Sequence, residues 1–218
     1  MKKLLTILLI ICFIILTIFK VKANITTFPL VGKTIILDSG HGGKDAGTIS
    51  NNIKEKDINL SIVYKLKSEL ETTGAVVLLT RTDDSDLSNP NATRRKKSDF
   101  DNRIALINNS KADIYISIHQ NNFSNSKYYG PQVFYSNKNS KNENLAKIIQ
   151  TDLNKFTDTR RKVKISTNTY MYNKLNIPGV LIECGFLSNP TELSKLTNSN
   201  YQKELSLVIT KSIIKYFN

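Results

Sequence analysis

Short apolar, β-rich segments alternate with helical ones along most of this chain, and that alternation leaves few folds open. Strand-like runs lie at residues 34–37, 75–80, 114–118, 132–136 and 180–182. Apolar residues recur at helical spacing over residues 57–71, 100–108, 142–156 and 201–216. Strands separated by helices favour an α/β layer fold. We therefore predict a single α/β domain with a mainly parallel twisted sheet flanked by helices on both faces.

The first residues differ from the rest of the chain. Lys2 and Lys3 precede an uncharged apolar run at residues 4–19, and Lys20 and Lys22 follow it. This pattern is typical of an export signal. The run is longer than the roughly 7–15 residues of a signal core and shorter than the roughly 20 of a membrane span. A cleaved signal peptide and an N-terminal membrane anchor therefore both stay open for residues 1–23.

Either interpretation places the rest of the chain outside the cytoplasmic membrane, with a linker at residues 24–32 and the domain at residues 33–218. The net charge is +13 at pH 7. For an exported protein this charge suggests an anionic matrix or membrane surface rather than nucleic acid, although a solvated basic surface would give the same charge. Cys184 is the only cysteine beyond the apolar run, so the domain has no internal disulfide.

Three of the predicted strands run into residues that bind metals or carry protons. The strand "TIIL" leads to Asp38 and His41, "IYISI" leads to His119 and Asn121, and "VLI" leads to Glu183. Ligands gather at the carboxyl ends of the strands in open α/β sheets. The chain has two histidines, and both lie at such ends. Two imidazoles and a carboxylate form a common ligand set for catalytic zinc.

Two glutamates could complete this site. Glu55 follows a glycine-rich turn at the start of a predicted helix, where an acid also stabilises the helix dipole. Glu183 lies in "GVLIECGF", where a carboxylate is unfavourable unless it is paired or coordinated. One would bind metal and the other would act as general base. Spacing alone does not decide between them.

The glycine-rich turn does not match the nucleotide-binding motifs. Gly40, Gly42 and Gly43 lack the third glycine of the dinucleotide fingerprint, and no Gly-Lys-Ser/Thr follows them. These glycines instead allow the backbone to turn sharply past a metal.

The motifs "LDSGHGGKDAG", "ISIHQN" and "VLIECGFLSNPTE", with a glutamate before a helix, resemble the zinc-dependent N-acetylmuramoyl-L-alanine amidases of the third amidase type. The resemblance covers about residues 33–218. Within that family, "RRKKSDFDNRIALIN" and the cysteine of "ECGFLSN" are most similar to the germination-specific, CwlD-type amidases of spore-forming bacteria. Ser39, Ala46 and Gln120 depart from the family pattern, but none of these changes removes a ligand.

The resemblance implies roles for particular residues. It implies that His41, Glu55 and His119 bind Zn²⁺ and that Glu183 is the general base. Arg103 matches a family arginine, and its role stays open between substrate contact and a structural ion pair. Asn121 is a further candidate for contacting substrate or supporting the site.

The implied reaction is hydrolysis of the amide between N-acetylmuramic acid and L-alanine in peptidoglycan, whose glycan strands and stem peptides would be the substrate. For the spore-associated type, the resemblance implies that removal of the peptide prepares muramic acid for conversion to its δ-lactam in the cortex by a different enzyme, and hence contributes to germination. The expected location is the cell wall or the forespore intermembrane space, with membrane attachment if residues 1–23 are retained. A regulatory or localising protein partner is expected, and nucleic acid is not. A zinc peptidase acting within stem peptides and a non-catalytic wall-binding module are the alternatives.

Overall fold

The computed structural model describes residues 3, 6–13, 28–166 and 170–218. Most of the predicted signal peptide or anchor, residues 1–23, lies outside the described residues, as does the first half of the predicted linker at residues 24–32. Among the residues described, none of the helices has the length and apolar character needed to cross a bilayer.

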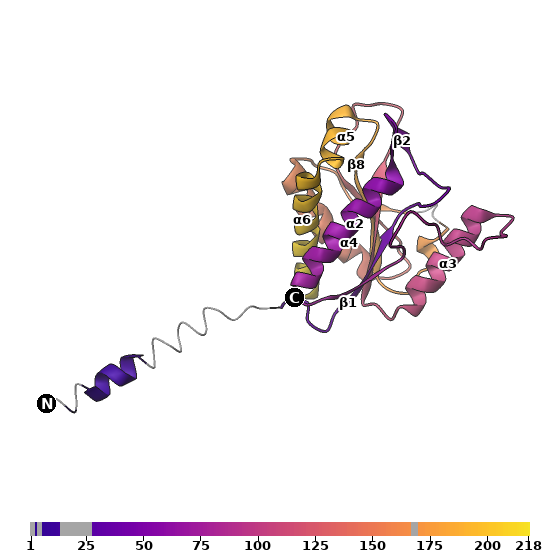
Figure 1. Ribbon diagram of the computed structural model, residues 1–218. Helices are drawn as coiled ribbons and strands as arrows, with labels where there is room; N and C mark the ends of the chain where they lie inside the picture. Colours follow the sequence, from indigo (N-terminus) through magenta and orange to yellow (C-terminus); the bar gives the residue numbers. More distant parts are fainter. Residues whose placement is uncertain (1–2, 4–5, 14–27, 167–169) are drawn as a thin grey trace.

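The centre of the fold is a six-stranded sheet (Figure 1). Its strands, in spatial order, are β4 (Val76–Leu79), β1 (Thr34–Ser39), β5 (Ile114–Asn121), β8 (Gly179–Phe186), β6 (Gln132–Tyr135) and β7 (Lys164–Ile165). Neighbouring strands are parallel except β6 and β8, which are antiparallel. The predicted mainly parallel sheet is therefore confirmed, with β6 and its parallel neighbour β7 running opposite to the other four strands.

Helices cover both faces of the sheet, as predicted. On one face lie α2 (Glu55–Thr72), α4 (Lys141–Thr157) and α6 (Ser199–Phe217), and on the other lies α3 (Arg95–Asn109) (Figure 1). Alternate residues of β1 point to opposite faces of the sheet. Ile35 and Leu37 belong to the larger core, whereas Ile36 packs in the core that contains Ile107 of α3. This alternation is the period of two expected of a strand buried on both faces.

Several short elements are absent from the sequence prediction. They are the hairpin of β2 (Ile49–Ser50) and β3 (Ile53–Lys54), the edge strand β7, the 3₁₀ turn η1 (Tyr172–Lys174) and α5 (Pro190–Leu196). α5 begins with a proline that follows an asparagine N-cap. The Asn189 side chain accepts hydrogen bonds from the backbone amides of Thr191 and Glu192 in the first turn of this helix. α3 begins at Arg95, earlier than the predicted residue 100, and an ion pair between Lys97 and Asp101 one turn apart supports this extension.

A buried arginine joins α3 to the end of β1. Arg103 is 2% exposed, and its Nη1 donates to Asp38 Oδ1 at 2.7 Å while its Nε donates to Asp99 Oδ2 at 2.9 Å. It also donates to the carbonyl oxygens of Ser39 at 2.8 Å and His41 at 2.6 Å. Arg103 therefore holds both the buried Asp38 carboxylate and the turn that follows β1.

Replacing Arg103 should test how much the fold depends on this ion pair. Arg103→Met leaves the Asp38 charge buried without its cation, so we expect the free energy of unfolding to fall by about 3–5 kcal/mol. Arg95→Met is the matched control, because Arg95 is 36% exposed in its ion pair with Asp86 and should contribute less than about 1 kcal/mol. Urea unfolding of both variants measures the difference, and equal small losses would contradict the structural role.

Candidate active site

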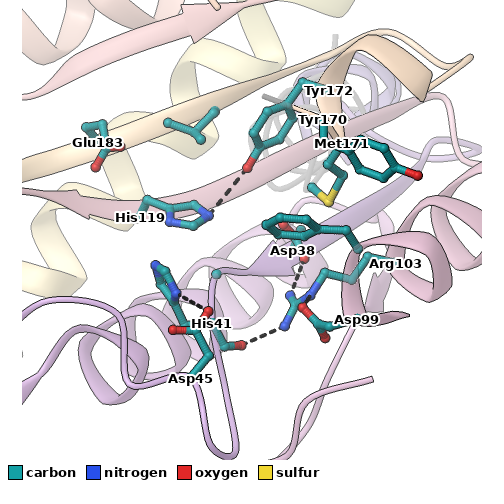
Figure 2. Close-up of a pocket in the computed structure, with 13 residues that line it drawn as sticks. Asp38, His41, Asp45, Asp99, Arg103, His119, Tyr170, Met171, Tyr172 and Glu183 are labelled. Atoms are coloured by element: carbon teal, nitrogen blue, oxygen red, sulfur yellow. Dashed lines mark hydrogen bonds and ion pairs between the residues drawn. The ribbon is translucent and has the colours of Figure 1, made fainter. Parts of the chain in front are cut away.

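The candidate site lies at the carboxyl ends of the three central strands β1, β5 and β8. The sheet register pairs Asp38 with Ser117, and His119 with Glu183, on adjacent strands. Asp38, His119 and Glu183 border a cavity of about 320 Å³ together with the turn after β1, as seen in Figure 2. The prediction that the polar strand ends meet at one edge is confirmed for these residues.

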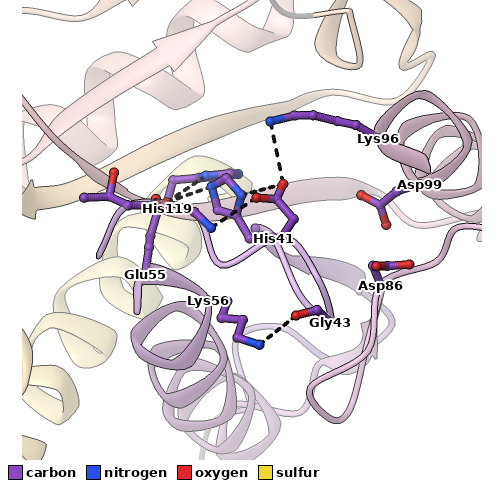
Figure 3. A network of polar contacts seen from close by, with 12 residues as sticks. His41, Gly43, Glu55, Lys56, Asp86, Lys96, Asp99 and His119 are labelled. Atoms are coloured by element: carbon purple, nitrogen blue, oxygen red, sulfur yellow. Dashed lines mark hydrogen bonds and ion pairs between the residues drawn. The ribbon is translucent and has the colours of Figure 1, made fainter. Parts of the chain in front are cut away.

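Two histidines converge on one carboxylate oxygen of Glu55. His41 Nε2 lies 3.1 Å from Glu55 Oε1, and His119 Nδ1 lies 3.2 Å from the same oxygen (Figure 3). The two imidazole rings are edge-on, with centroids 5.0 Å apart. One ligand atom from each residue lies within 4.8 Å of the others, so this cluster could hold a metal ion.

Glu55 is held in an ionised form by its surroundings. Its Oε2 accepts from the amide of Thr48 at 2.9 Å, and its Oε1 accepts from the amide of Gln120 at 3.0 Å. Burial acts to raise the pKa of Glu55, but the hydrogen bonds and charges of His119 and His41 outweigh it and lower the pKa far below its usual range. A carboxylate that stays charged in a buried place is suited to bind a cation.

Glycines allow the turn after β1 to pass close to the cluster. An alanine Cβ at position 40 would lie 2.3 Å from the His119 ring, and one at position 47 would lie 2.6 Å from Glu55 Oε2. His41 itself has a φ of 62°, in the left-handed region that non-glycine residues rarely adopt. For Gly40 this geometry agrees with the sequence prediction that the glycines let the backbone turn past the site, whereas Gly47 was not part of that prediction.

Each histidine also has a partner for its outward-facing nitrogen. His41 Nδ1 lies 3.0 Å from Asp45 Oδ2, and His119 Nε2 lies 3.4 Å from the Tyr172 hydroxyl (Figure 2). Burial acts to lower the pKa of His41, but Glu55 and Asp45 raise it above its usual value. The sequence analysis missed both partners. The spacing of four residues from His41 could have pointed to Asp45, whereas no local signal identifies Tyr172.

Glu183 lies on β8 beside His119, facing the cavity. No hydrogen-bond partner for its buried Oε2 occurs among the residues that the structure describes. Loss of solvent contact is the main cause that raises the pKa of Glu183, to about 7, while the nearby His119 acts in the opposite direction. An enclosed carboxyl that titrates near neutrality and keeps one oxygen free can exchange protons with a molecule in the cavity.

The two further predicted residues have different places. Arg103 borders the cavity, but most of its donors are taken by Asp38, Asp99 and the turn. The Asn121 side chain accepts a hydrogen bond from the adjacent Asn122 amide at 2.9 Å, beyond an irregularity in the register of β5 with β8. Asn121 is not among the described residues that line the cavity.

The close approach at position 40 gives a test of the turn. Gly40→Ala should push the His119 ring or the turn aside, so that the cluster would hold a metal ion less well and the free energy of unfolding would fall by about 1–3 kcal/mol. Gly185→Ala is the control, because its Cβ would approach no closer than 3.1 Å, to the flexible end of Leu196. Zn²⁺ titration and urea unfolding measure both effects. Unchanged Zn²⁺ affinity in Gly40→Ala would show that the turn need not pass so close to His119.

The chain is similar to known amidases over most of its length. Residues 35–215 match the family model Amidase_3, described as N-acetylmuramoyl-L-alanine amidase. The germination-specific N-acetylmuramoyl-L-alanine amidase of Bacillus subtilis is 42% identical over 196 residues, covering 88% of this chain and 82% of that protein.

Solved structures agree with this match. The CwlD amidase from Clostridioides difficile, in complex with the GerS lipoprotein, is 44% identical with a TM-score of 0.81, covering 85% of this chain and 98% of that one. An N-acetylmuramoyl-L-alanine amidase from Clostridium difficile is 34% identical with a TM-score of 0.75, covering 84% of this chain and 96% of that one. The predicted resemblance is thereby confirmed: the chain belongs to the Amidase_3 family and is an N-acetylmuramoyl-L-alanine amidase.

Proposed function

We propose that this amidase is an exported zinc hydrolase in which His41, Glu55 and His119 hold the metal and Glu183 is the general base. Its substrate would be the amide bond between N-acetylmuramic acid and L-alanine in peptidoglycan. The observation that carries the proposal is the convergence of three ligand atoms within 4.8 Å, in the cavity that Glu183 also borders.

The chemistry of the cluster fits zinc. Two imidazole nitrogens and one carboxylate leave a fourth position for water or substrate, as in catalytic zinc sites. Ligand atoms bound tetrahedrally at about 2.0–2.1 Å lie roughly 3.3 Å apart. The separations of 3.1 and 3.2 Å between the histidine nitrogens and Glu55 Oε1 are close to that value.

Glu183 would carry the proton transfers of the reaction. When bound, zinc would polarise the scissile carbonyl as a Lewis acid and lower the pKa of water to about 7. Glu183 would accept a proton from the attacking water and deliver it to the amide nitrogen as the C–N bond breaks, giving the lactyl carboxylate and the free amine of L-alanine. Its pKa of about 7 in the metal-free protein favours both accepting and releasing that proton.

An apolar wall of the cavity supports binding of a large substrate beside the cluster. Phe100 and Tyr170 stack with ring centroids 6.4 Å apart, and Met171 borders the same cavity. Aromatic rings and apolar side chains suit the less polar face of a sugar and the methyl groups of lactyl and alanyl units. The polar cluster would then face the amide between them.

The relatives suggest where the enzyme acts. Because one is germination-specific and another was solved with a lipoprotein, we propose a role in spore cortex maturation, through muramic-δ-lactam formation, and a lipoprotein partner. The cell wall or the forespore intermembrane space would be the location. Residues 1–23 would serve as signal peptide or membrane anchor, residues 24–32 as linker and residues 33–218 as catalytic domain.

Product analysis tests the activity. Purified wild-type protein with Zn²⁺ should release stem peptides with free L-alanine amino groups and leave lactyl carboxylates on the glycan. Glu183→Gln should lower turnover by at least about 10²-fold while keeping zinc, because it removes the base and not a ligand. His41→Ala should lose zinc. Cleavage within stem peptides would instead support the peptidase, and full activity of Glu183→Gln would overturn the role of the base.

The raised pKa of Glu183 gives a second test without activity. A carboxyl whose folded pKa is about 7, above its ordinary 4.5, stabilises the fold at low pH and loses that contribution as the pH rises through about 7. In EDTA, Glu183→Gln should therefore gain stability relative to wild type between pH 5 and 8, by up to about 3 kcal/mol. Urea unfolding at a series of pH values measures this, and a pH-independent difference would show that Glu183 titrates normally.

A further inference from the structure

The buried Asp38 carboxylate determines which groups donate and which accept in the hydrogen bonds around it. Burial acts to raise the pKa of Asp38, but Arg103 outweighs this and keeps the carboxyl ionised. An ionised carboxylate can only accept hydrogen bonds. Its Oδ1 accepts from Arg103 and from Thr80 Oγ1 at 2.9 Å, and its Oδ2 accepts from Ser117 Oγ at 2.6 Å.

The same order of donor and acceptor continues through the hydroxyl groups of Ser117 and Tyr172. Because Ser117 gives its one proton to Asp38, its oxygen can only accept from the Tyr172 hydroxyl, which lies 2.9 Å away. Tyr172 is buried, and this burial raises its pKa well above the ordinary value, so the hydroxyl keeps its proton and donates it to Ser117. The Tyr172 oxygen then presents a lone pair to His119 Nε2, at 3.4 Å.

We propose that Tyr172 is a positioning residue that holds His119 with its proton on Nε2, leaving the Nδ1 lone pair free to bind metal beside Glu55 and His41. The proposal rests on the metal site proposed above. A histidine that binds a metal through one nitrogen usually donates a hydrogen bond from the other, which fixes the tautomer and ring orientation. In this arrangement the hydrogen bonds of Arg103, Asp38 and Ser117 reach His119 through Tyr172.

The two histidines would then bind through different nitrogens. His41 turns Nε2 to Glu55 and donates from Nδ1 to Asp45, whereas His119 turns Nδ1 to Glu55 and donates from Nε2 to Tyr172. The alternative tautomer of His119 would place its proton on Nδ1, where it could donate to Glu55 Oε1 at 3.2 Å. A metal ion would have to displace that proton. By accepting a hydrogen bond from Nε2, the Tyr172 oxygen favours the tautomer of His119 whose Nδ1 is unprotonated and free to bind metal.

Substitution of the tyrosine hydroxyl tests the proposal through metal affinity. Tyr172→Phe should weaken Zn²⁺ binding by about tenfold, at the low end of the range for such partners because the O···N separation is long. Tyr115→Phe is the matched control: Tyr115 is buried, its ring stacks on Tyr172 with centroids 6.3 Å apart, and its hydroxyl is outside the Asp38–Ser117–Tyr172–His119 series. Competition with a chelator of known affinity measures both full-length proteins.

A second variant tests the direction of the hydrogen bonds. Ser117→Ala keeps the tyrosine but removes its acceptor, so the Tyr172 proton can turn toward His119 Nε2 and favour the unsuitable tautomer. We expect Zn²⁺ affinity to fall about threefold. This variant also serves if Tyr172→Phe does not fold.

Nitrogen-15 NMR of the zinc-loaded wild type gives a third readout. It should show the His119 proton on Nε2, and Tyr172→Phe should speed exchange of that proton with solvent. A proton on Nδ1, or equal zinc affinity in wild type and both variants, would overturn the role of Tyr172 while leaving the metal site intact. A wild type that binds no zinc would instead refute the proposed function, and the inference with it.

Discussion

The ion pair between Arg103 and Asp38 is the interaction on which the geometry of the site depends. Both side chains are almost fully buried, so neither charge would be tolerated there alone. The same guanidinium holds the Ser39 and His41 carbonyls, and the same carboxylate accepts from Ser117 of the next strand. One pair therefore connects α3, β1, β5 and the turn that carries His41. A site assembled from separate strand ends needs such a fixed centre, because displacements of about 1 Å can abolish ligand geometry.

The overall fold was largely predictable from the sequence because its signals are local. Apolar runs and helical spacing identify the central strands and the long helices, and both are properties of neighbouring residues. The direction of β6 was not predictable in this way, since a strand pairs by contacts with β8 that lie about 50 residues away in the chain. The early start of α3 was missed because its first turn is basic and polar, and a side-chain pair to Asp101 rather than an apolar face supports it.

The candidate site was predictable to the extent that its residues end strands. His41, His119 and Glu183 follow or end apolar runs, and a parallel sheet brings such ends to one edge. Spacing left the roles of Glu55 and Glu183 open, and the structure distinguishes their surroundings: Glu55 receives several donors, whereas Glu183 keeps a free oxygen. Tyr172 could not have been found, because its contact with His119 depends on how η1 packs against the sheet.

The separation of the cluster along the chain has a consequence for assembly. His41 and Glu55 are close in the chain, since Glu55 begins α2 directly after the β2–β3 hairpin, but His119 is more than 60 residues away and joins them only when β5 pairs with β1. An unfolded or partly folded chain therefore offers no complete chelate, so an ion that binds the cluster selects the finished sheet and shifts the folding equilibrium toward it. The fraction of folded protein would in this way depend on the metal supply, and scarce metal would leave a larger fraction of the chain unfolded and open to proteolysis.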